Sequence, residues 1–158
     1  MSSLPLLDQP PTRPTRSGAA LLVHLARHMR VRSEAAIAPL GLRARHLIAL
    51  TVLRDQDGST QQSLSRTLQI DRTNLVGLLN ELEADGLVAR RRSTEDRRRH
   101  IVELTGTGLQ RLAQAELALA AAEDEVLGAL DRAQREDLCR LLQQATAESA
   151  PICAADEA

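Results

Sequence analysis

The sequence predicts a mainly α-helical protein built around a winged helix-turn-helix, with a two-stranded β wing and with long helices at both ends of the chain. Three observations support this fold class. Apolar residues recur at three- and four-residue steps over most of the chain, which is the period of amphipathic helices. Two short helices are expected on either side of a tight turn near residue 70. A pair of short β-like runs follows them, with a strongly basic segment in between.

The N-terminal part of the chain starts with residues 1–16, which contain four prolines and are expected to form a flexible arm. Residues 17–41 are expected to form a helix that a proline and a glycine bring to an end. Its apolar positions are Leu21, Leu22, Leu25 and Met29. A second helix is predicted over residues 42–54, before the turn signal Asp57-Gly58.

The central segment carries the helix-turn-helix pattern. Ser59 or Thr60 is placed to cap a short helix that ends at Leu68. Asp71 can cap the next helix, predicted over residues 72–85. The apolar face of that helix is formed by Leu75, Leu78, Leu79 and Leu82.

A basic hairpin is expected directly after these helices. Gly86 is placed to end the preceding helix in a left-handed conformation. Residues 87–89 and 100–104 are the two β-like runs, and the polar residues 90–99 form the tip between them. Residues 42–104 are therefore expected to be one winged helix-turn-helix lobe.

The C-terminal part, residues 105–158, is predicted to hold a long helix capped by Thr105, a last helix over residues 131–147 and a tail. The long helix carries apolar residues at close to heptad spacing: Leu109, Leu112, Leu119 and Val126. One chain has too little material to cover this stripe. We therefore expect residues 105–158 and residues 17–41 to form dimerisation helices.

Composition places strong limits on the chemistry. There is no Phe, Tyr or Trp, and all 20 basic side chains are arginines. Any pocket must therefore recognise its ligand without aromatic stacking. The net charge is −1, yet residues 88–100 hold six arginines and only two acids. A near-neutral protein with one concentrated basic segment is suited to local binding of a polyanion.

Several function classes lack their sequence signals. The chain contains no Gly-rich phosphate loop, no G-x-S-x-G and no H-E-x-x-H, so we expect neither an enzyme nor a bound cofactor. It also lacks an apolar run long enough for a membrane span and the continuous apolar core of a signal peptide. Its two cysteines are too few for a disulfide framework, and a cytoplasmic location is expected.

The order of two short helices and then a basic hairpin has a direct physical use. The second helix fits the major groove of DNA, where base edges present distinguishable donors and acceptors. The hairpin reaches sideways to the backbone and to the minor groove, whose negative potential attracts arginine. A transcriptional regulator that binds double-stranded DNA is therefore the function this order favours.

At these positions the sequence resembles the multiple-antibiotic-resistance regulator (MarR) family. The resemblance rests on residues 82–90 (LEADGLVAR), then on Asp96-Arg97-Arg98, then on residues 102–105 (VELT). It extends upstream to Gly41-Leu42, although Arg43 stands for the usual Thr and His46 for the usual Gln. The resemblance implies a homodimer that pairs through its terminal helices and binds a pseudo-palindromic operator, and we expect a repressor.

The candidate DNA-binding residues lie on three elements. Glutamine and serine residues open the first short helix, where free N–H groups and polar side chains suit a phosphate. On the second helix, Asn can pair with adenine and Arg with guanine. The resemblance implies that Asp96 braces the wing while Arg98 enters the minor groove, although Arg97 remains an alternative. The full set is Gln61, Gln62, Ser63, Arg72, Thr73, Asn74, Gly77, Asp96, Arg97, Arg98 and Arg99.

The resemblance also implies a small-molecule effector, with aromatic acids and phenols as the expected ligands. The candidate ligand-binding residues are Arg16, His24, His28, Arg45 and His46. An arginine there would bind a carboxylate with two parallel hydrogen bonds. His24 and His28 are four residues apart on one helix face, so packing, a dimer contact or a metal are alternatives for this pair. We expect no metal.

The sequence leaves two alternatives to an aromatic-ligand sensor open. One is a metal- or redox-responsive regulator of the same fold, in which Cys139 and Cys153 would be the candidate thiols. The other is a dimeric winged-helix adaptor that contacts proteins and not DNA. The three adjacent arginines of the wing argue against the adaptor, because they repel one another unless a polyanion is nearby.

Overall fold

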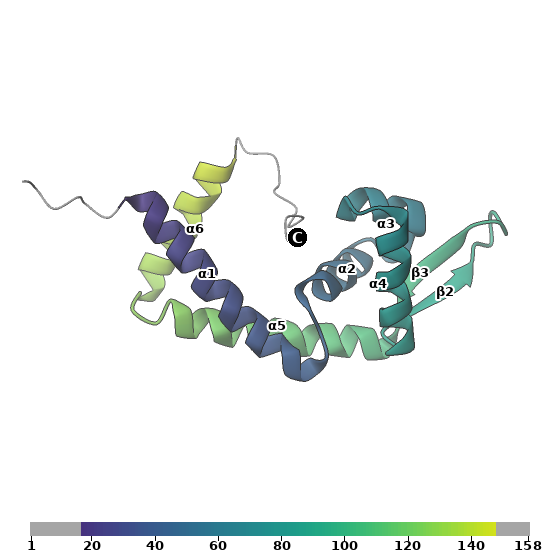
Figure 1. Cartoon of the computed structure of the whole chain (residues 1–158), viewed down its shortest axis with the longest axis horizontal. Helices are drawn as coiled ribbons and strands as arrows, with labels where there is room; N and C mark the ends of the chain where they lie inside the picture. The colour runs from purple at the N-terminus through teal and green to yellow at the C-terminus, as the bar shows by residue number, and fades with distance from the viewer. Residues whose placement is uncertain (1–16, 148–158) are drawn as a thin grey trace, which may run out of the picture.

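The computed structural model describes residues 17–147, which form an elongated molecule with two distinct ends (Figure 1). The long helix α5 (Gly106–Val126) runs along the molecule and joins a winged lobe to an end made of helices α1 (Gly18–Ile37) and α6 (Arg132–Thr146). The elements in chain order are α1 (Gly18–Ile37), the 3-10 helix η1 (Ala38–Leu40), α2 (Ala44–Asp55), β1 (Ser59–Thr60), α3 (Gln61–Leu68), α4 (Arg72–Ala84), β2 (Val88–Arg92), β3 (His100–Leu104), α5 (Gly106–Val126) and α6 (Arg132–Thr146). The predicted mainly α-helical winged fold is confirmed.

The helices of the lobe begin at the predicted caps. Thr60 Oγ1 accepts a hydrogen bond from the backbone N–H of Ser63 at 3.2 Å. Asp71 Oδ1 accepts from the N–H groups of Thr73 and Asn74 at 2.9 and 3.0 Å. Each bond satisfies N–H groups that have no partner inside the helix, which is why these positions start helices.

The second helix starts later than predicted, at Ala44 instead of residue 42. Leu42 lies in the connection and is only 3% exposed, because it packs into the core of the lobe. Gly41 reverses the chain just before it, with a φ of 71° that most side chains avoid. The first apolar residue of the predicted helix thus lies in the turn before it. The apolar pattern alone therefore placed the start of the helix two residues too early.

The wing sheet has three strands, in the order β1-β3-β2, where the sequence predicted two. Strands β2 and β3 pair antiparallel from Val88↔Leu104 to Arg92↔His100. Strand β1 adds only Ser59 and Thr60 along β3, and two residues are too short to show an alternating pattern. Strand β2 also continues to Arg92, so the tip comprises residues 93–99 and is shorter than predicted.

The hydrophobic side chains in the core of the lobe are all aliphatic. The largest fully buried ones are Leu50, Leu53, Leu64, Leu75, Leu79, Leu82, Leu87, Leu112 and Val102. Helix α5 enters this core at Gly108, where a Cβ atom would lie 2.0 Å from the carbonyl oxygen of Leu87. Because Gly108 has no side chain, the long helix can pack directly against the base of the wing.

The opposite end of the molecule is much less covered. Helix α1 packs along α5, yet Ile37 is its only buried residue. Helix α6 has no buried residue at all. Large apolar side chains that stay exposed at this end are Leu21, Leu22, Val23, Val31, Leu117, Leu141 and Leu142. The described chain therefore leaves an apolar surface on α1, α5 and α6 without a cover.

Among the described residues, no single helix is long and apolar enough to cross a membrane. Only the pair made of residues 18–40 and 44–55 reaches that length and composition, and it is bent by 75° at the break between its helices.

Candidate nucleic-acid interface

The arginines of the winged lobe fall into two groups. Some are paired with carboxylates, including two from strand β2: Arg90 Nη1 lies 2.9 Å from Glu83 Oε2, and Arg91 Nη2 lies 2.5 Å from Glu103 Oε1. Others have no side-chain ion pair within residues 17–147, among them Arg66, Arg72, Arg92, Arg97 and Arg98. Exposed like charges without partners favour a polyanion as their neighbour.

Several of these arginines meet in an open groove of about 590 Å³ between α3, the start of α4 and the wing. The groove is lined by Thr60, Gln61, Gln62, Ser65, Arg66, Arg72, Arg98, Arg99 and His100. No carboxylate is among the lining residues. The surface thus combines positive charge with neutral hydrogen-bonding side chains, which is the chemistry that binds phosphate oxygens.

The start of helix α3 contributes the neutral part of the groove. Gln61 and Gln62 line it, whereas Ser63, also predicted, is exposed but not among its lining residues. The backbone N–H of Ser63 is already used by the Thr60 cap. Of the predicted α3 residues, the structure therefore brings the two glutamines together with the wing arginines.

Helix α4 presents its predicted residues on the side opposite the buried leucines. Arg72, Thr73, Asn74 and Gly77 are all exposed. The Asn74 side chain is partly committed, because Nδ2 donates to Asp71 Oδ2. The backbone N–H of Asn74 also lowers the pKa of Asp71, which keeps the cap ionised. Bidentate pairing of Asn74 with adenine would compete with this bond.

The wing tip is held by Asp96. Its Oδ1 accepts a hydrogen bond from the backbone N–H of Arg98 at 3.0 Å, and its Oδ2 lies 3.4 Å from Arg99 Nε. The N–H of Arg99 donates to the Asp96 carbonyl oxygen at 2.9 Å. These contacts fix the turn and leave the guanidinium groups of Arg97 and Arg98 without a partner among the described residues.

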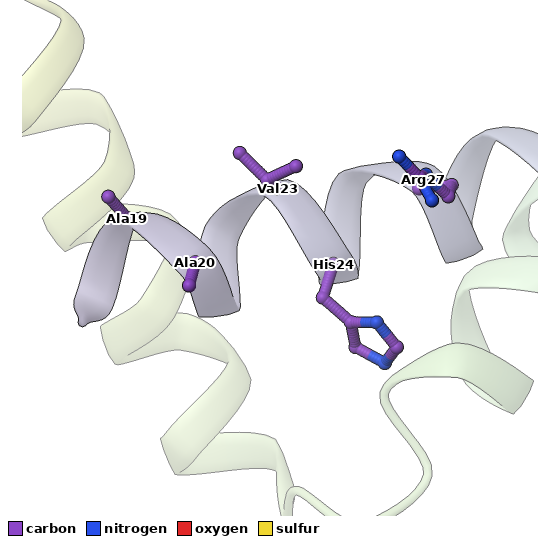
Figure 2. A pocket seen from close by; sticks show the side chains of 5 residues that line it. All are labelled: Ala19, Ala20, Val23, His24 and Arg27. Carbon is purple, nitrogen blue, oxygen red and sulfur yellow. The ribbon is translucent and has the colours of Figure 1, made fainter. Parts of the chain in front are cut away.

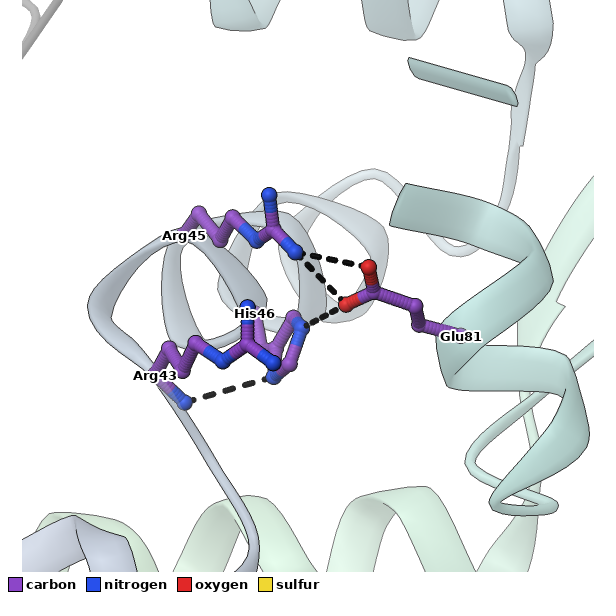
Figure 3. Close-up of polar contacts among 4 residues, drawn as sticks. All are labelled: Arg43, Arg45, His46 and Glu81. Atoms are coloured by element: carbon purple, nitrogen blue, oxygen red, sulfur yellow. Dashed lines mark hydrogen bonds and ion pairs between the residues drawn. The ribbon is translucent and has the colours of Figure 1, made fainter. Parts of the chain in front are cut away.

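A polar cluster joins helix α2 to helix α4 (Figure 3). Arg45 Nη2 lies 2.7 Å from both carboxylate oxygens of Glu81, and His46 Nε2 lies 2.8 Å from Glu81 Oε2. The Nδ1 atom of His46 accepts a hydrogen bond from the backbone N–H of Arg43 at 3.3 Å. His46 is 3% exposed, so this cluster is partly inside the lobe. The hydrogen bonds from His46 and then Arg45 lower the pKa of Glu81.

Two of the predicted ligand-binding residues therefore already have partners. The donors of Arg45 and His46 are directed at Glu81, and a ligand at this place would have to displace that carboxylate. Arg16, a third candidate, lies outside the described residues.

The remaining ligand candidates, His24 and His28, lie exposed on α1. His24 lines an open pocket of about 390 Å³ together with Ala19, Ala20, Val23 and Arg27 (Figure 2). In that view its ring extends away from the helix axis. Every lining residue comes from α1, and His28 is not among them. The structure thus places His24 and His28 on a different part of the molecule from the Arg45–Glu81 cluster.

Metal binding and thiol chemistry have few candidate groups in the described part of the chain. Within residues 17–147, no group of three or more His, Cys, Asp or Glu side chains is arranged to hold a metal ion. Cys139 is a free, exposed thiol on α6, and Cys153 lies outside the described residues.

Sequence reasoning missed several residues that the structure brings to these surfaces. Arg66 and His100 line the groove, and Arg27 lines the α1 pocket. Helical spacing could have found two of them, because Arg66 follows Gln62 by four residues and Arg27 follows His24 by three. His100 starts the second predicted β-like run, and the start of β3 comes close to α3 because β3 also pairs with β1, a contact that no local pattern reports.

Comparison with known proteins assigns this architecture to a family. Residues 40–99 match the model of the MarR family. The chain is similar to a proposed transcriptional regulatory protein for the hcr operon of Thauera aromatica, with 34% identity over 95 residues. That match covers 60% of this chain and spans only 57% of the length of that relative.

Two further relatives are similar over nearly their whole length. The HTH-type transcriptional repressor NicR of Pseudomonas putida is 30% identical over 144 residues, which cover 90% of each chain. The solved structure of the transcriptional repressor CouR bound to a 23-mer DNA duplex is 29% identical, with a TM-score of 0.69 over 85% of this chain and 99% of that one.

Proposed function

Because the chain belongs to the MarR family of DNA-binding transcriptional regulators, we propose that it is a homodimeric repressor of a pseudo-palindromic operator in the cytoplasm. We further propose that a small anionic aromatic compound releases it from DNA. The observation that carries the proposal is the groove between α3, α4 and the wing, which is lined by arginines and contains no carboxylate.

In the proposed complex, helix α4 enters the major groove and the wing follows the backbone towards the minor groove. Arg66 and Arg72 would contact phosphates beside α4, together with Gln61 and Gln62. Thr73, Asn74 and Gly77 would face the base edges, with Ser63 at the margin of the contact. Asp96 would hold the wing tip, from which Arg97, Arg98 and Arg99 reach the DNA.

The relatives support this direction of control. NicR is described as a transcriptional repressor, and CouR as a transcriptional repressor bound to a DNA duplex. The chain is similar to both over most of its length, so repression is the form of regulation we propose here. The family regulates transcription, and an enzymatic activity is not proposed.

A dimer is proposed because helix α6 has little cover within one chain. It is 15 residues long and buries none of them against the rest of the described chain. Isolated helices of this length are marginal in water. Its leucines Leu138, Leu141 and Leu142 would be covered by the α1, α5 and α6 surface of a second copy, which has the same apolar character.

The effector is proposed for the α1 end of the molecule. The pocket beside His24 and Arg27 combines a cation with the small apolar side chains of Ala19, Ala20 and Val23. A carboxylate could pair with Arg27 while its ring lies on the apolar wall. Since all lining residues come from one helix, the second copy would supply the other wall. Arg16 and His28 remain candidates for contacts to the same ligand.

Binding measurements test the proposal. DNA selected from a random duplex library should bind with an affinity that falls steeply with salt, because arginines displace counterions from phosphates. Arg72→Ala should weaken binding, whereas Arg132→Ala, on exposed α6, should not. Sedimentation at micromolar concentration should show twice the chain mass. A monomer would refute the dimer, and a protein that selects no DNA would favour the adaptor alternative.

A further inference from the structure

Helix α4 has few hydrogen-bonding side chains left for DNA bases. The Asn80 Oδ1 atom accepts from Arg90 Nη2 at 2.9 Å, and Glu83 accepts from the same arginine. Glu81 is held by Arg45 and His46, as described above. Asn74 directs its amide group to the Asp71 cap. Beyond Arg72 and Thr73, each polar side chain of the helix is therefore engaged within the protein.

The residues that remain in the middle of the exposed face are small or apolar. Val76 is 36% exposed, although the groove that begins one turn away at Arg72 is lined by polar and basic side chains. Next to it, Gly77 has no side chain, and a Cβ built there would meet nothing within 4 Å. Thr73, one turn earlier, adds a methyl group as well as a hydroxyl. Together they form a shallow apolar surface at the middle of α4.

The charges around this surface identify its occupant. Arg72 lies one turn before Val76 on α4 and faces the basic groove, and Arg98 and Arg99 of the wing line the same groove. A polyanion bound by these cations brings α4 against its base edges. The only apolar group on the major-groove edge of DNA is the C5-methyl of thymine. An apolar surface framed by arginines thus matches thymine and not the other three bases.

We propose that helix α4 recognises thymine in each half-site through its C5-methyl group, with Val76 as the contact residue and Gly77 allowing the close approach. This inference rests on the proposed placement of α4 in the major groove. Discrimination in the middle of the half-site then comes from burial of a methyl group, not from a bidentate hydrogen bond. The amide of Asn74 is left to hold the cap.

The experiment replaces thymine by deoxyuracil, which lacks only the methyl group and keeps the base pair and the O4 acceptor. Duplexes are selected from a random library with the wild-type dimer, and single thymines of the selected half-site are then exchanged for deoxyuracil. Affinities are measured by fluorescence anisotropy at one fixed salt concentration. Burial of one methyl is worth about 0.8 kcal/mol, so one exchange facing Val76 should weaken binding about fourfold.

The variant Val76→Ala removes the proposed contact and should fold, because Ala has the higher helix propensity and the site is exposed. Val76→Ala should bind the thymine duplex and the deoxyuracil duplex with equal affinity, within a factor of about 1.5, because it no longer buries the methyl group. Ile48→Val removes one methyl from an exposed side chain on α2 and should keep the full discrimination. Deoxyuracil at positions outside the half-sites should have no effect.

Three outcomes would overturn the inference. Wild-type protein could bind its selected DNA with no loss on any deoxyuracil exchange. The selected half-sites could contain no thymine opposite α4. Val76→Ala could keep the fourfold loss, which would assign the methyl contact to another residue. Failure to select any DNA would instead refute the proposed function, so the two failures are distinguishable.

Discussion

The Nε2 atom of His46 lies 2.8 Å from Glu81 Oε2, so helix α2 is hydrogen-bonded directly to the helix proposed to enter the major groove. Since His46 Nδ1 accepts from the backbone N–H of Arg43, the proton resides on Nε2, which donates to the carboxylate. The same imidazole thus starts α2 and anchors α4. A glutamine side chain could make both bonds, with its oxygen towards Arg43 and its nitrogen towards Glu81.

We first predict that Glu81→Leu lowers the melting temperature and weakens DNA binding a few-fold, because α4 loses its link to α2 and buried His46 loses its acceptor. Glu81→Gln should have a smaller effect, since the amide oxygen still accepts from His46. His46→Gln should stay close to wild type and His46→Leu should not. The slope of affinity against salt should be unchanged in all four variants, because no phosphate contact is removed. Equal behaviour of His46→Gln and His46→Leu would contradict the anchoring role.

The same carboxylate makes part of the stability pH-dependent. The pKa of Glu81 is lowered by His46 and then by Arg45, so its ionised form stabilises the fold. This contribution is complete above the ordinary carboxyl range of about pH 4 and is lost as the pH falls through the lowered pKa. Denaturant titrations of wild type and Glu81→Gln should therefore differ at neutral pH and converge in acid.

The second prediction concerns the unpaired wing arginines. Arg98→Ala should weaken operator binding by about 1–3 kcal/mol and reduce the salt slope by about one, while the dimer stays folded. The fold should tolerate the change because the Arg98 side chain has no partner within the described residues. Arg97→Ala is the parallel variant. If Arg98→Ala binds like wild type and Arg97→Ala does not, Arg97 is the residue that enters the minor groove.

The third prediction concerns Asp96, whose removal should change DNA affinity in the direction opposite to that expected from its charge. Asp96→Ala removes a negative charge from a surface proposed to bind DNA, so electrostatics alone would tighten binding. We expect weaker binding instead, because Asp96 fixes the Arg98 backbone and pairs with Arg99. Asp96→Asn keeps an acceptor for the Arg98 N–H and should recover part of the loss. Tighter binding by Asp96→Ala in anisotropy titrations would show that the tip needs no brace.

Much of the fold was predictable because its signals are local. Caps at Thr60, Asp71 and Thr105 use side chains within three residues of the N–H groups that they satisfy. The features that were missed depend on long-range pairing. Strand β1 exists only because β3 lies beside it, and the use of Arg45 and His46 is set by Glu81, 35 or more residues away. Nothing in the sequence near residue 46 indicates that partner.

The site was predictable to a similar extent. Exposure of Arg72 and Gly77 follows from the buried leucines of α4, which the helical period identifies. The commitment of Asn74 to Asp71 is local too, but it competes with base pairing, and composition cannot decide such a competition. Arg90 and Arg91 were assigned to the hairpin tip with the other arginines, yet they lie in β2 and are paired with Glu83 and Glu103. A run of arginines in the sequence thus overestimates the number of cations that are free to bind DNA.

The fourth prediction contrasts two glycines. Gly77→Ala should raise the stability of the free protein by about 0.5–1 kcal/mol, since a helix interior favours Ala and the added Cβ meets nothing within 4 Å. It should also weaken DNA binding if α4 approaches the bases closely. Gly108→Ala should do the opposite to stability, because its Cβ would lie 2.0 Å from the Leu87 carbonyl. Thermal unfolding and anisotropy together check both. Unchanged DNA affinity for Gly77→Ala would argue against close approach.

The last prediction concerns effector release. Benzoate should stabilise the dimer in dye-based thermal shifts and should weaken DNA binding, whereas the neutral amide benzamide should do neither. The reason is that the pocket on α1 offers a cation and aliphatic walls but no aromatic ring, so the anion depends on its arginine. Arg27→Ala should therefore reduce the benzoate response and leave DNA affinity near that of wild type. His24→Ala and Arg16→Ala are the next variants to compare.

Linkage supplies a quantitative check on this mechanism. If benzoate lowers DNA affinity by some factor, saturating DNA must lower benzoate affinity by the same factor. Calorimetric titration of the dimer with and without operator measures that factor independently of the anisotropy result. Disagreement between the two factors would show that benzoate weakens DNA binding without binding to the dimer, for example through its effect as a salt. An Arg27→Ala protein that keeps the full response would move the ligand away from α1, and the Arg45–His46–Glu81 cluster would then be the next place to test, with displacement of Glu81 as the required step.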